Sequence, residues 1–229
     1  EVAEMPGALP LLSFTMSELY RAYVRSGRSD RCLAAADYQR LNGVAGALSH
    51  RANEIFQSLD VAHQRTLQRV MLRMVSIQAG EVARRRVPLD ELRYGEGHPE
   101  ETRKQAVLDR LKDARLIVSG TDNEGTPYVE PAHDKLVLGW PQLWDFIKQE
   151  QETISLQRLL TQEASTWAKK KRYRQNLWTT SHRLPLVVEL QKQEPERFNA
   201  QEDEFIRKSE RRRLLQRNLV IAAVSSIII

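Results

Sequence analysis

The segment Glu100–Glu130 reads EETRKQAVLDRLKDARLIVSGTDNEGTPYVE and joins a helix signal to a hairpin signal. Val107, Leu108 and Leu111 recur at helical spacing, which predicts a helix over residues 100–114. Residues 115–119 and 126–130 have the composition of short strands, and the polar segment 122–125 between them ends in glycine, which predicts a tight antiparallel turn. We therefore expect a helix that leads directly into two paired strands.

The preceding residues extend this pattern to a winged helix-turn-helix. Apolar side chains at positions 67, 70, 71, 74 and 75 predict a helix over 63–78, ended by Gly80. Residues 84–87 are expected to be extended, and residues 88–92 to form one or two helical turns. Three helices and a β-hairpin in this order are the elements of a winged helix-turn-helix, which we predict for residues 63–150.

The remainder of the chain is predicted to be helical, so the fold class is mainly α. Residues 1–62 should contain a helix that begins near Pro10 and ends at Gly27, a loop or short helix over 37–46, and a helix over 47–59. A long helix is expected to begin at His133 and to run past residue 147. Residues 151–213 should form a helical connector with breaks at its two prolines, Pro185 and Pro195.

Two further features mark the C-terminal part. Asn199 and Glu202 have the spacing of a capping pair for a last helix that begins at Ala200. Residues 214–229 then become apolar, which is typical of either the start of a membrane span or a short buried helix. Lys208, the arginines of 211–213 and Arg217 precede the apolar run proper, residues 218–229. Such basic clusters flank the cytoplasmic side of membrane helices, which favours the span.

Charge and cysteine content limit the classes of function. The formal net charge is +5, but residues 64–150 carry 14 basic and 14 acidic residues, and the whole surplus lies in residues 151–229. A DNA-binding winged helix normally accumulates positive charge, so its neutrality argues against DNA. The single cysteine, Cys32, cannot form an internal disulfide, and no secretory signal is visible, so a cytoplasmic location is expected.

Motifs for self-contained catalysis are absent from this sequence. It contains no Gly-x-x-x-x-Gly-Lys-Ser/Thr phosphate loop, His-Glu-x-x-His, Cys-x-x-Cys or Gly-x-Ser-x-Gly motif, so neither a catalytic site nor a metal site is predicted. Arg84–Arg86 could form a solvated edge strand or contact phosphate, and the first is favoured. The basic run Lys169–Arg174 is open to three interpretations, a solvated helix end or a patch for anionic lipid or RNA. Trp140 and Trp144 are expected to pack in a core.

His133 stands between the second predicted strand and the following helix. A side-chain donor and free N–H groups at a helix N-terminus could meet an anion such as phosphate. The residues alone favour a simpler interpretation, in which His133 or Asp134 only caps the helix.

Several motifs in order resemble bacterial STAND-type signalling NTPases, in the part that follows their P-loop core. They are GALPLLS at residues 7–13, ELY at 18–20, GVAGAL at 43–48, AHDKL at 132–136 and WPQL at 140–143. The resemblance covers nearly the whole chain and implies a helical lid over residues 1–62. It further implies that Pro10 packs near the adenine and that His133 touches the β-phosphate of bound ADP. This sequence departs from the family pattern at two places: Asp134 stands where glutamate is usual, and Leu138–Gly139 stands where a basic residue is common, so that cation is missing here.

The resemblance implies a regulatory part of a STAND ATPase, in which the ADP or ATP state controls a conformational switch and signal transduction. Nucleotide and Mg²⁺ would be held by an upstream P-loop core. The resemblance also implies a downstream WD-repeat sensor and self-association on activation. The basic and apolar C-terminal residues add the expectation of attachment to the inner face of the cytoplasmic membrane. The alternative is a membrane-tethered winged-helix transcription regulator. A third alternative is a structural adaptor near the membrane.

Overall fold

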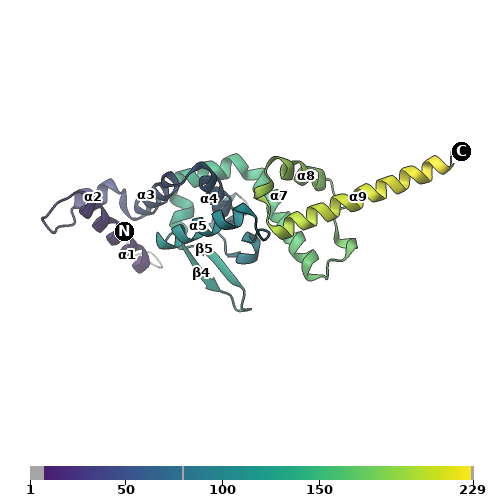
Figure 1. Ribbon diagram of the computed structural model, residues 1–229. Helices are drawn as coiled ribbons and strands as arrows, with labels where there is room; N and C mark the ends of the chain where they lie inside the picture. The colour runs from purple at the N-terminus through teal and green to yellow at the C-terminus, as the bar shows by residue number, and fades with distance from the viewer. Residues whose placement is uncertain (1–7, 79, 228–229) are drawn as a thin grey trace. The chain divides into compact units, whose positions relative to one another are not determined.

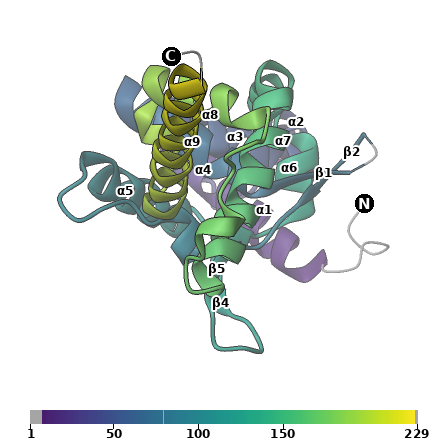
Figure 2. The ribbon, with the colours of Figure 1, turned by 90° about the vertical axis from the view of Figure 1, so that its right-hand side faces the viewer.

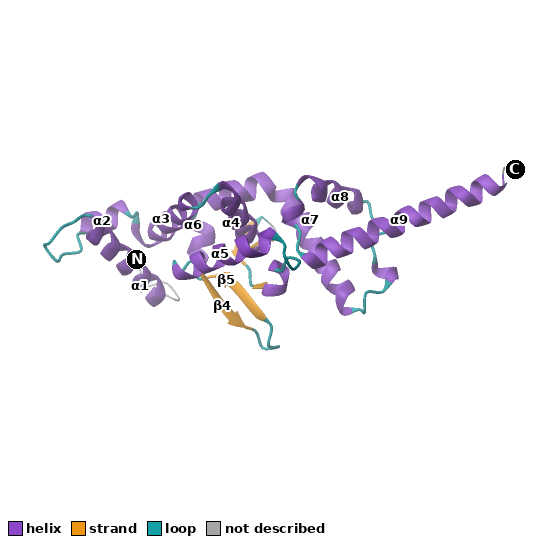
Figure 3. Ribbon diagram, viewed as in Figure 1, coloured by secondary structure: helices purple, strands orange, loops and turns teal. Residues whose placement is uncertain are grey.

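The computed structural model describes residues 8–78 and 80–227, and this part of the chain is mainly helical with two small antiparallel sheets (Figures 1 and 3). The chain divides into two compact units. Unit 1 comprises residues 1–89 and 102–149, and unit 2 comprises residues 90–101 and 150–229. Each unit has its own buried apolar residues, so each is described by itself below.

Unit 1 begins with the helices α1 (Ala8–Arg25), α2 (Ala35–Arg40) and α3 (Gly43–Ser58). The predicted first helix is confirmed, although Pro6 and Gly7 lie outside the described residues. The helix expected over 47–59 begins earlier, at Gly43, because Asn42 adopts a left-handed conformation with φ of 55° and reverses the chain there. α1 and α3 pack on one another through buried residues that include Phe14 and Leu48.

The helix predicted over residues 63–78 is confirmed as far as Arg73 and is wrong for its last five residues. α4 spans Val61–Arg73, and the chain then forms β1 (Val75–Gln78), which pairs antiparallel with β2 (Glu81–Arg84) (Figure 2). Gly80 does not end a helix but lies in the turn of this hairpin, with φ of +85°. The apolar residues Met74 and Val75 fit the helical period, but they are fully buried at the junction between α4 and β1. The period alone therefore does not show where the helix ends.

The predicted hairpin is confirmed with small shifts of its ends. α5 (Pro99–Asp113) leads into β4 (Ile117–Thr121) and β5 (Pro127–Pro131) (Figure 3). β3 (Val87–Pro88) pairs with the other side of β5, which gives the strand order β3-β5-β4. The Asp122 carboxylate accepts hydrogen bonds from the N–H groups of Glu124 and Thr126 at 2.9 and 2.8 Å. This local network fixes the turn, and Gly125 supplies a positive φ of +82°.

The long helix expected from His133 is interrupted. α6 spans only Asp134–Gly139, and α7 (Pro141–Lys169) begins after Trp140, whose extended backbone separates the two. The Trp140 indole is buried, as expected, and its Nε1–H donates to Asn53 Oδ1 at 2.7 Å. Pro141 cannot donate a backbone hydrogen bond to a continuing helix, so the break has a direct cause. α7 has a kink at Glu150, where unit 1 gives way to unit 2.

Unit 2 contains the second part of α7, α8 (Arg183–Gln193) and α9 (Ala200–Ile227). It also contains the first three residues of α5 and the short 3-10 turns η1 (Leu89–Leu92), η2 (Arg174–Asn176) and η3 (Pro195–Arg197), although Leu89 itself belongs to unit 1. Its core includes Trp167, Leu184, Val187 and Phe205. Contrary to the prediction, Pro185 does not break a helix. It lies in the first turn of α8, where its missing N–H would have had no intrahelical partner.

The predicted capping pair at the start of α9 is confirmed. The Asn199 N–H donates to Glu202 Oε2 at 3.0 Å, and the Glu202 N–H donates to Asn199 Oδ1 at 2.8 Å. Residues 214–227 continue α9. Leu214, Leu215, Leu219, Val220 and Ile221 are exposed, so residues 214–221 do not form the buried helix considered above. Within residues 8–78 and 80–227, no helix combines the length and apolar character that crossing a bilayer requires.

Candidate functional site

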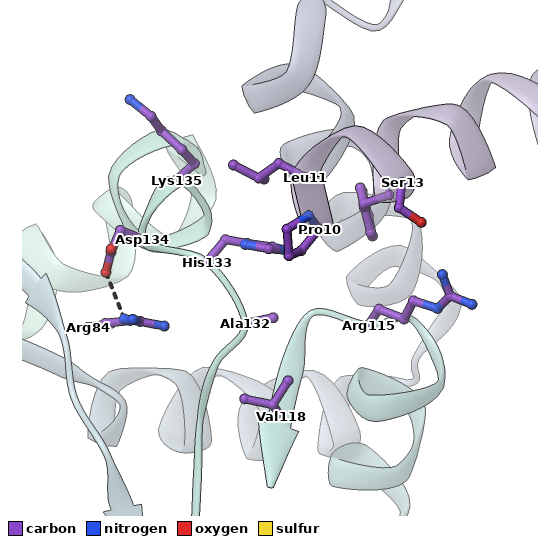
Figure 4. A pocket seen from close by; sticks show the side chains of 11 residues that line it. Pro10, Leu11, Ser13, Arg84, Arg115, Val118, Ala132, His133, Asp134 and Lys135 are labelled. Atoms are coloured by element: carbon purple, nitrogen blue, oxygen red, sulfur yellow. Dashed lines mark ion pairs between the residues drawn. The ribbon is translucent and has the colours of Figure 1, made fainter. Parts of the chain in front are cut away.

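A pocket of about 750 Å³ in unit 1 collects side chains from four separate parts of the chain (Figure 4). Both residues that the sequence singled out, Pro10 and His133, line it. In Figure 4 the imidazole of His133 points toward Pro10. The remaining lining residues are Leu11, Ser13 and Phe14 of α1, Arg84 of β2, Arg115 and Val118 around the start of β4, and Ala132, Asp134 and Lys135 around the start of α6.

The end of β5 positions His133. The Ala132 N–H donates to Leu116 O at 2.9 Å, so the residue before His133 is tied to the segment that enters β4. His133 then takes the N-cap position of α6 with an extended backbone, but its side chain forms no capping hydrogen bond. The simple capping interpretation of His133 is therefore wrong, and the imidazole is directed to the pocket instead (Figure 4).

The length of α6 changes the expected source of anion affinity. Six residues align few peptide dipoles, so this N-terminus attracts an anion less than the long predicted helix would. Cationic side chains have to contribute more of the positive potential in the pocket. Three of the lining residues, Arg84, Arg115 and Lys135, carry such charges.

Arg84 is held in place by two contacts with the connection between β5 and α6. Its Nε lies 2.9 Å from Asp134 Oδ1, and its Nη1 donates to Pro131 O at 3.3 Å. Asp134 thus pairs with Arg84. The neighbouring arginines are also engaged, since Arg85 donates to Arg73 O at 3.1 Å and Arg86 to Glu130 Oε2 at 3.2 Å. The basic strip is therefore bound to protein acceptors rather than merely solvated.

Arg115 owes its position to the way α5 ends. The Arg115 N–H donates to Lys112 O at 2.8 Å and the Leu116 N–H donates to Leu111 O at 2.9 Å, which is the Schellman arrangement of a helix C-terminus. Arg115 occupies the left-handed position with φ of 56°, which glycine usually takes. Leu111 and Leu116 are both buried, so the apolar contact typical of this motif fixes the turn and leaves the arginine exposed at the pocket.

The electrostatics of the pocket favour a neutral imidazole beside several cations. Burial lowers the pKa of His133, the charge of Arg84 lowers it further, and Asp134 partly opposes both. A neutral imidazole has one N–H to donate, and its protonation does not need to change for it to bind a phosphate oxygen. Arg115 and Lys135 form no ion pair within the described residues, so their charges are available to an anionic ligand.

The sequence identified only part of this pocket. Arg115 was not singled out, because a non-glycine residue in the left-handed region carries no reliable local signal. Lys135 was quoted only as a member of a motif. Among residues 8–78 and 80–227, no group of three or more histidine, cysteine, aspartate or glutamate residues is arranged to hold a metal ion.

Comparison with known families places most of the chain in one of them. Residues 1–175 match the family model described as Novel STAND NTPase 1. Comparison with curated proteins and with solved structures gives no match. The matched range contains every residue that lines the pocket.

Proposed function

Because the chain belongs to the Novel STAND NTPase 1 family, we propose that it is the regulatory part of a STAND ATPase that couples the ADP or ATP state to a conformational switch in signalling. One observation carries this proposal. Pro10 of α1 and His133 at the start of α6 line the same pocket, together with the cationic side chains of Arg84, Arg115 and Lys135. The pocket thus combines an apolar wall with groups that bind phosphate, as a nucleotide requires.

The residues of the pocket suggest how a nucleotide would be held. Pro10 and Leu11 offer apolar surface to a base, while the His133 N–H and the guanidinium of Arg115 are suited to phosphate oxygens. Arg84 is already bound to Asp134, so its first role is to position the β5–α6 connection. A volume of about 750 Å³ lies within the ordinary range of small-molecule sites, roughly 300 to 1,000 Å³. Mg²⁺ and the triphosphate would be held by a P-loop core, whose motif this sequence does not contain.

A surface on α1 fits the proposed contact with that core. Leu12, Met16, Tyr20 and Val24 follow one another at intervals of four residues, and each is between 41% and 60% exposed. Such spacing places all four side chains along one face of the helix. An exposed apolar stripe of this kind is suited to packing against another domain, and it begins beside Pro10, where a bound nucleotide would lie.

The element order supports the winged-helix part of the proposal. After α4 and the inserted β1–β2 hairpin, the chain continues through β3, η1, α5, β4 and β5 in the order of a winged helix, and the strand order β3-β5-β4 is consistent with its wing. ADP and ATP would make different contacts with the winged helix. The exchange of one for the other would therefore shift the position of the winged helix and expose surface for self-association. A WD-repeat sensor remains the proposed source of the input signal.

DNA binding is less consistent with the charges of α5. The exposed side chains on its unit 1 part are Thr102, Gln105, Ala106, Asp109, Arg110 and Asp113, so two carboxylates oppose one guanidinium on the face that would enter a groove. Asp109 and Asp113 would lie against the phosphate lattice and repel it. A mobility-shift titration that showed tight, sequence-selective and salt-sensitive binding would nevertheless restore this function.

The test uses the full-length protein, including its P-loop core. Replacing His133 with alanine is expected to reduce the ADP that copurifies with the protein, because one phosphate contact is lost while the P-loop remains intact. His50→Ala is the matched control, since His50 is exposed on α3 and does not line the pocket. Nucleotide content is measured by chromatography of the denatured protein. Equal ADP content in the wild type and in His133→Ala would contradict the proposal.

A further inference from the structure

The basic run Lys169–Arg174 forms a tight turn in unit 2. Lys171 and Arg172 both adopt left-handed backbone conformations, with φ of 53° and 57°, and the Arg172 N–H donates to Trp167 O at 2.9 Å. The guanidinium of Arg172 consequently folds back over the Trp167 ring, at 5.7 Å from its centroid, and pairs with Glu204 of α9 at 3.2 Å. The turn is therefore fixed against α9 rather than extended into solvent.

This turn and α9 together form a small basic pocket. Arg172, Tyr173, Arg174 and Gln175 line it from the turn, and Arg212 lines it from α9, around a volume of about 580 Å³. Glu204 and Arg212 are separated by eight residues, which places them on one face of α9, about two turns apart. Three guanidinium groups thus line this pocket. Among the described residues, Glu204 supplies the only carboxylate that pairs with any of them.

The state of Arg212 indicates that this pocket is made for a ligand. Its Nη1 atom is inaccessible to solvent and has no hydrogen-bond partner among the described residues. Buried guanidinium donors are normally satisfied by a carboxylate, a carbonyl or a bound anion, because leaving one unpaired destabilises the protein. Arg212 shares this pocket with Arg172 and Arg174, so an anion bound there would satisfy the donor.

We propose that Arg172, Arg174 and Arg212 form a binding site for a phosphate group. A guanidinium presents two parallel N–H donors to a pair of phosphate oxygens, and three of them can engage all the oxygens of one phosphate. The Tyr173 side chain is 53% exposed at the rim and can add a hydroxyl donor. This site lies in unit 2, apart from the pocket of the proposed function, and Arg212 lies outside the range matched by the family.

Two sources of phosphate share this chemistry, a free phosphate compound and the headgroup of an anionic lipid. On α9, Leu215 and Leu219 follow Arg212 within two turns and are 55% and 71% exposed, so a lipid headgroup in the site would have apolar side chains near it. The experiment therefore has one arm for each source.

In the first arm, inorganic phosphate is titrated calorimetrically into the 229-residue chain in chloride buffer of constant ionic strength. In the second, sedimentation measures binding to vesicles of phosphatidylglycerol with phosphatidylcholine, against phosphatidylcholine alone. Arg212→Gln and Arg174→Gln should each weaken binding by about tenfold or more, the loss expected when a charge-assisted hydrogen bond is removed. Arg213→Gln removes the same charge one residue along α9, at an exposed position outside the pocket, and should weaken binding less than about twofold.

Loss of phosphate binding in Arg212→Gln but not in Arg213→Gln would support the site, with free phosphate as a sufficient ligand. The same pattern for vesicles alone would support it with a lipid headgroup as the ligand. Equal losses in Arg212→Gln and Arg213→Gln would overturn it in favour of general electrostatic attraction, and so would the absence of binding in both arms. Arg174 is exposed, so Arg174→Gln keeps the test valid if Arg212→Gln folds poorly, which circular dichroism would reveal.

Discussion

Replacing Asn199 with alanine is expected to loosen the first turn of α9. The Asn199 side chain accepts from the Glu202 N–H at 2.8 Å and donates from Nδ2 to Glu91 O at 3.1 Å. Loss of an asparagine N-cap costs about 1 kcal/mol. Loss of the second hydrogen bond adds about 1 kcal/mol, because Asn199 is only 2% exposed and water replaces the contact poorly. We therefore expect local opening of the α9 N-terminus to become easier by about 2 kcal/mol.

Hydrogen exchange resolved by peptide or by residue measures this change directly. A decrease of about 2 kcal/mol in the free energy of opening corresponds to roughly 30-fold faster exchange of the amides over residues 202–206. Asn218→Ala is the control, because Asn218 is exposed near the other end of the same helix. In this variant, amide exchange over residues 202–206 should change by less than about twofold. Unchanged exchange over residues 202–206 in Asn199→Ala would refute the assigned capping role, as would an equal effect in both variants.

The other predictions concern unit 1. Arg84→Gln should raise the pKa of His133, because the arginine charge is one of the causes that lower it, and NMR titration of the imidazole measures this; Arg86→Gln, whose guanidinium pairs with Glu130, should leave it unchanged. Since the folded-state pKa of His133 lies below its unfolded value, its contribution to stability should be fully present above about pH 6.5 and be lost as the pH falls through the folded pKa. A stability profile of His133→Gln that falls as steeply as the wild type over that range would argue against this. Tyr20 is 60% exposed, so Tyr20→Asp should weaken the association of unit 1 with the P-loop core, measured by calorimetry, without lowering the melting temperature of unit 1. Arg21→Asp is the control, because Arg21 is also exposed but lies off the apolar stripe, and it should weaken the association less.

Features that depend on neighbouring residues could be predicted from the sequence. The Asn199–Glu202 capping pair needs only four residues to form, and the turn between β4 and β5 is fixed by Asp122 and Gly125 within the turn itself. In both cases the hydrogen bonds that determine the structure join residues at most four positions apart. Tertiary context therefore had little to add to these predictions.

Features that depend on tertiary pairing could not be predicted in this way. Val75–Gln78 leaves the helical pattern because it pairs with β2 and because the Arg85 N–H donates to Met74 O at 2.7 Å, a contact that no local period reveals. The sequence linked Pro10 to His133 only through a family resemblance, since they lie on elements far apart in the chain. Arg115 was missed because its left-handed backbone is stabilised by the Schellman hydrogen bonds rather than by its own residue type.

Arg115 also allows a direct test of whether this pocket sacrifices stability for binding. An arginine in the left-handed region costs about 1 to 2 kcal/mol that glycine would not. The larger unfolded-state entropy of glycine offsets about 0.5 to 1 kcal/mol of this, so Arg115→Gly should stabilise unit 1 by about 0.5 to 1 kcal/mol. The same change at Arg110, inside α5, should instead destabilise it by about 1 kcal/mol. Denaturant unfolding measures both, and nucleotide content of the full-length protein measures the cost to binding. A more stable Arg115→Gly with reduced ADP would show that the arginine is kept for its charge, whereas a destabilised Arg115→Gly would mean that contacts of its side chain support the fold and that the strain argument is wrong.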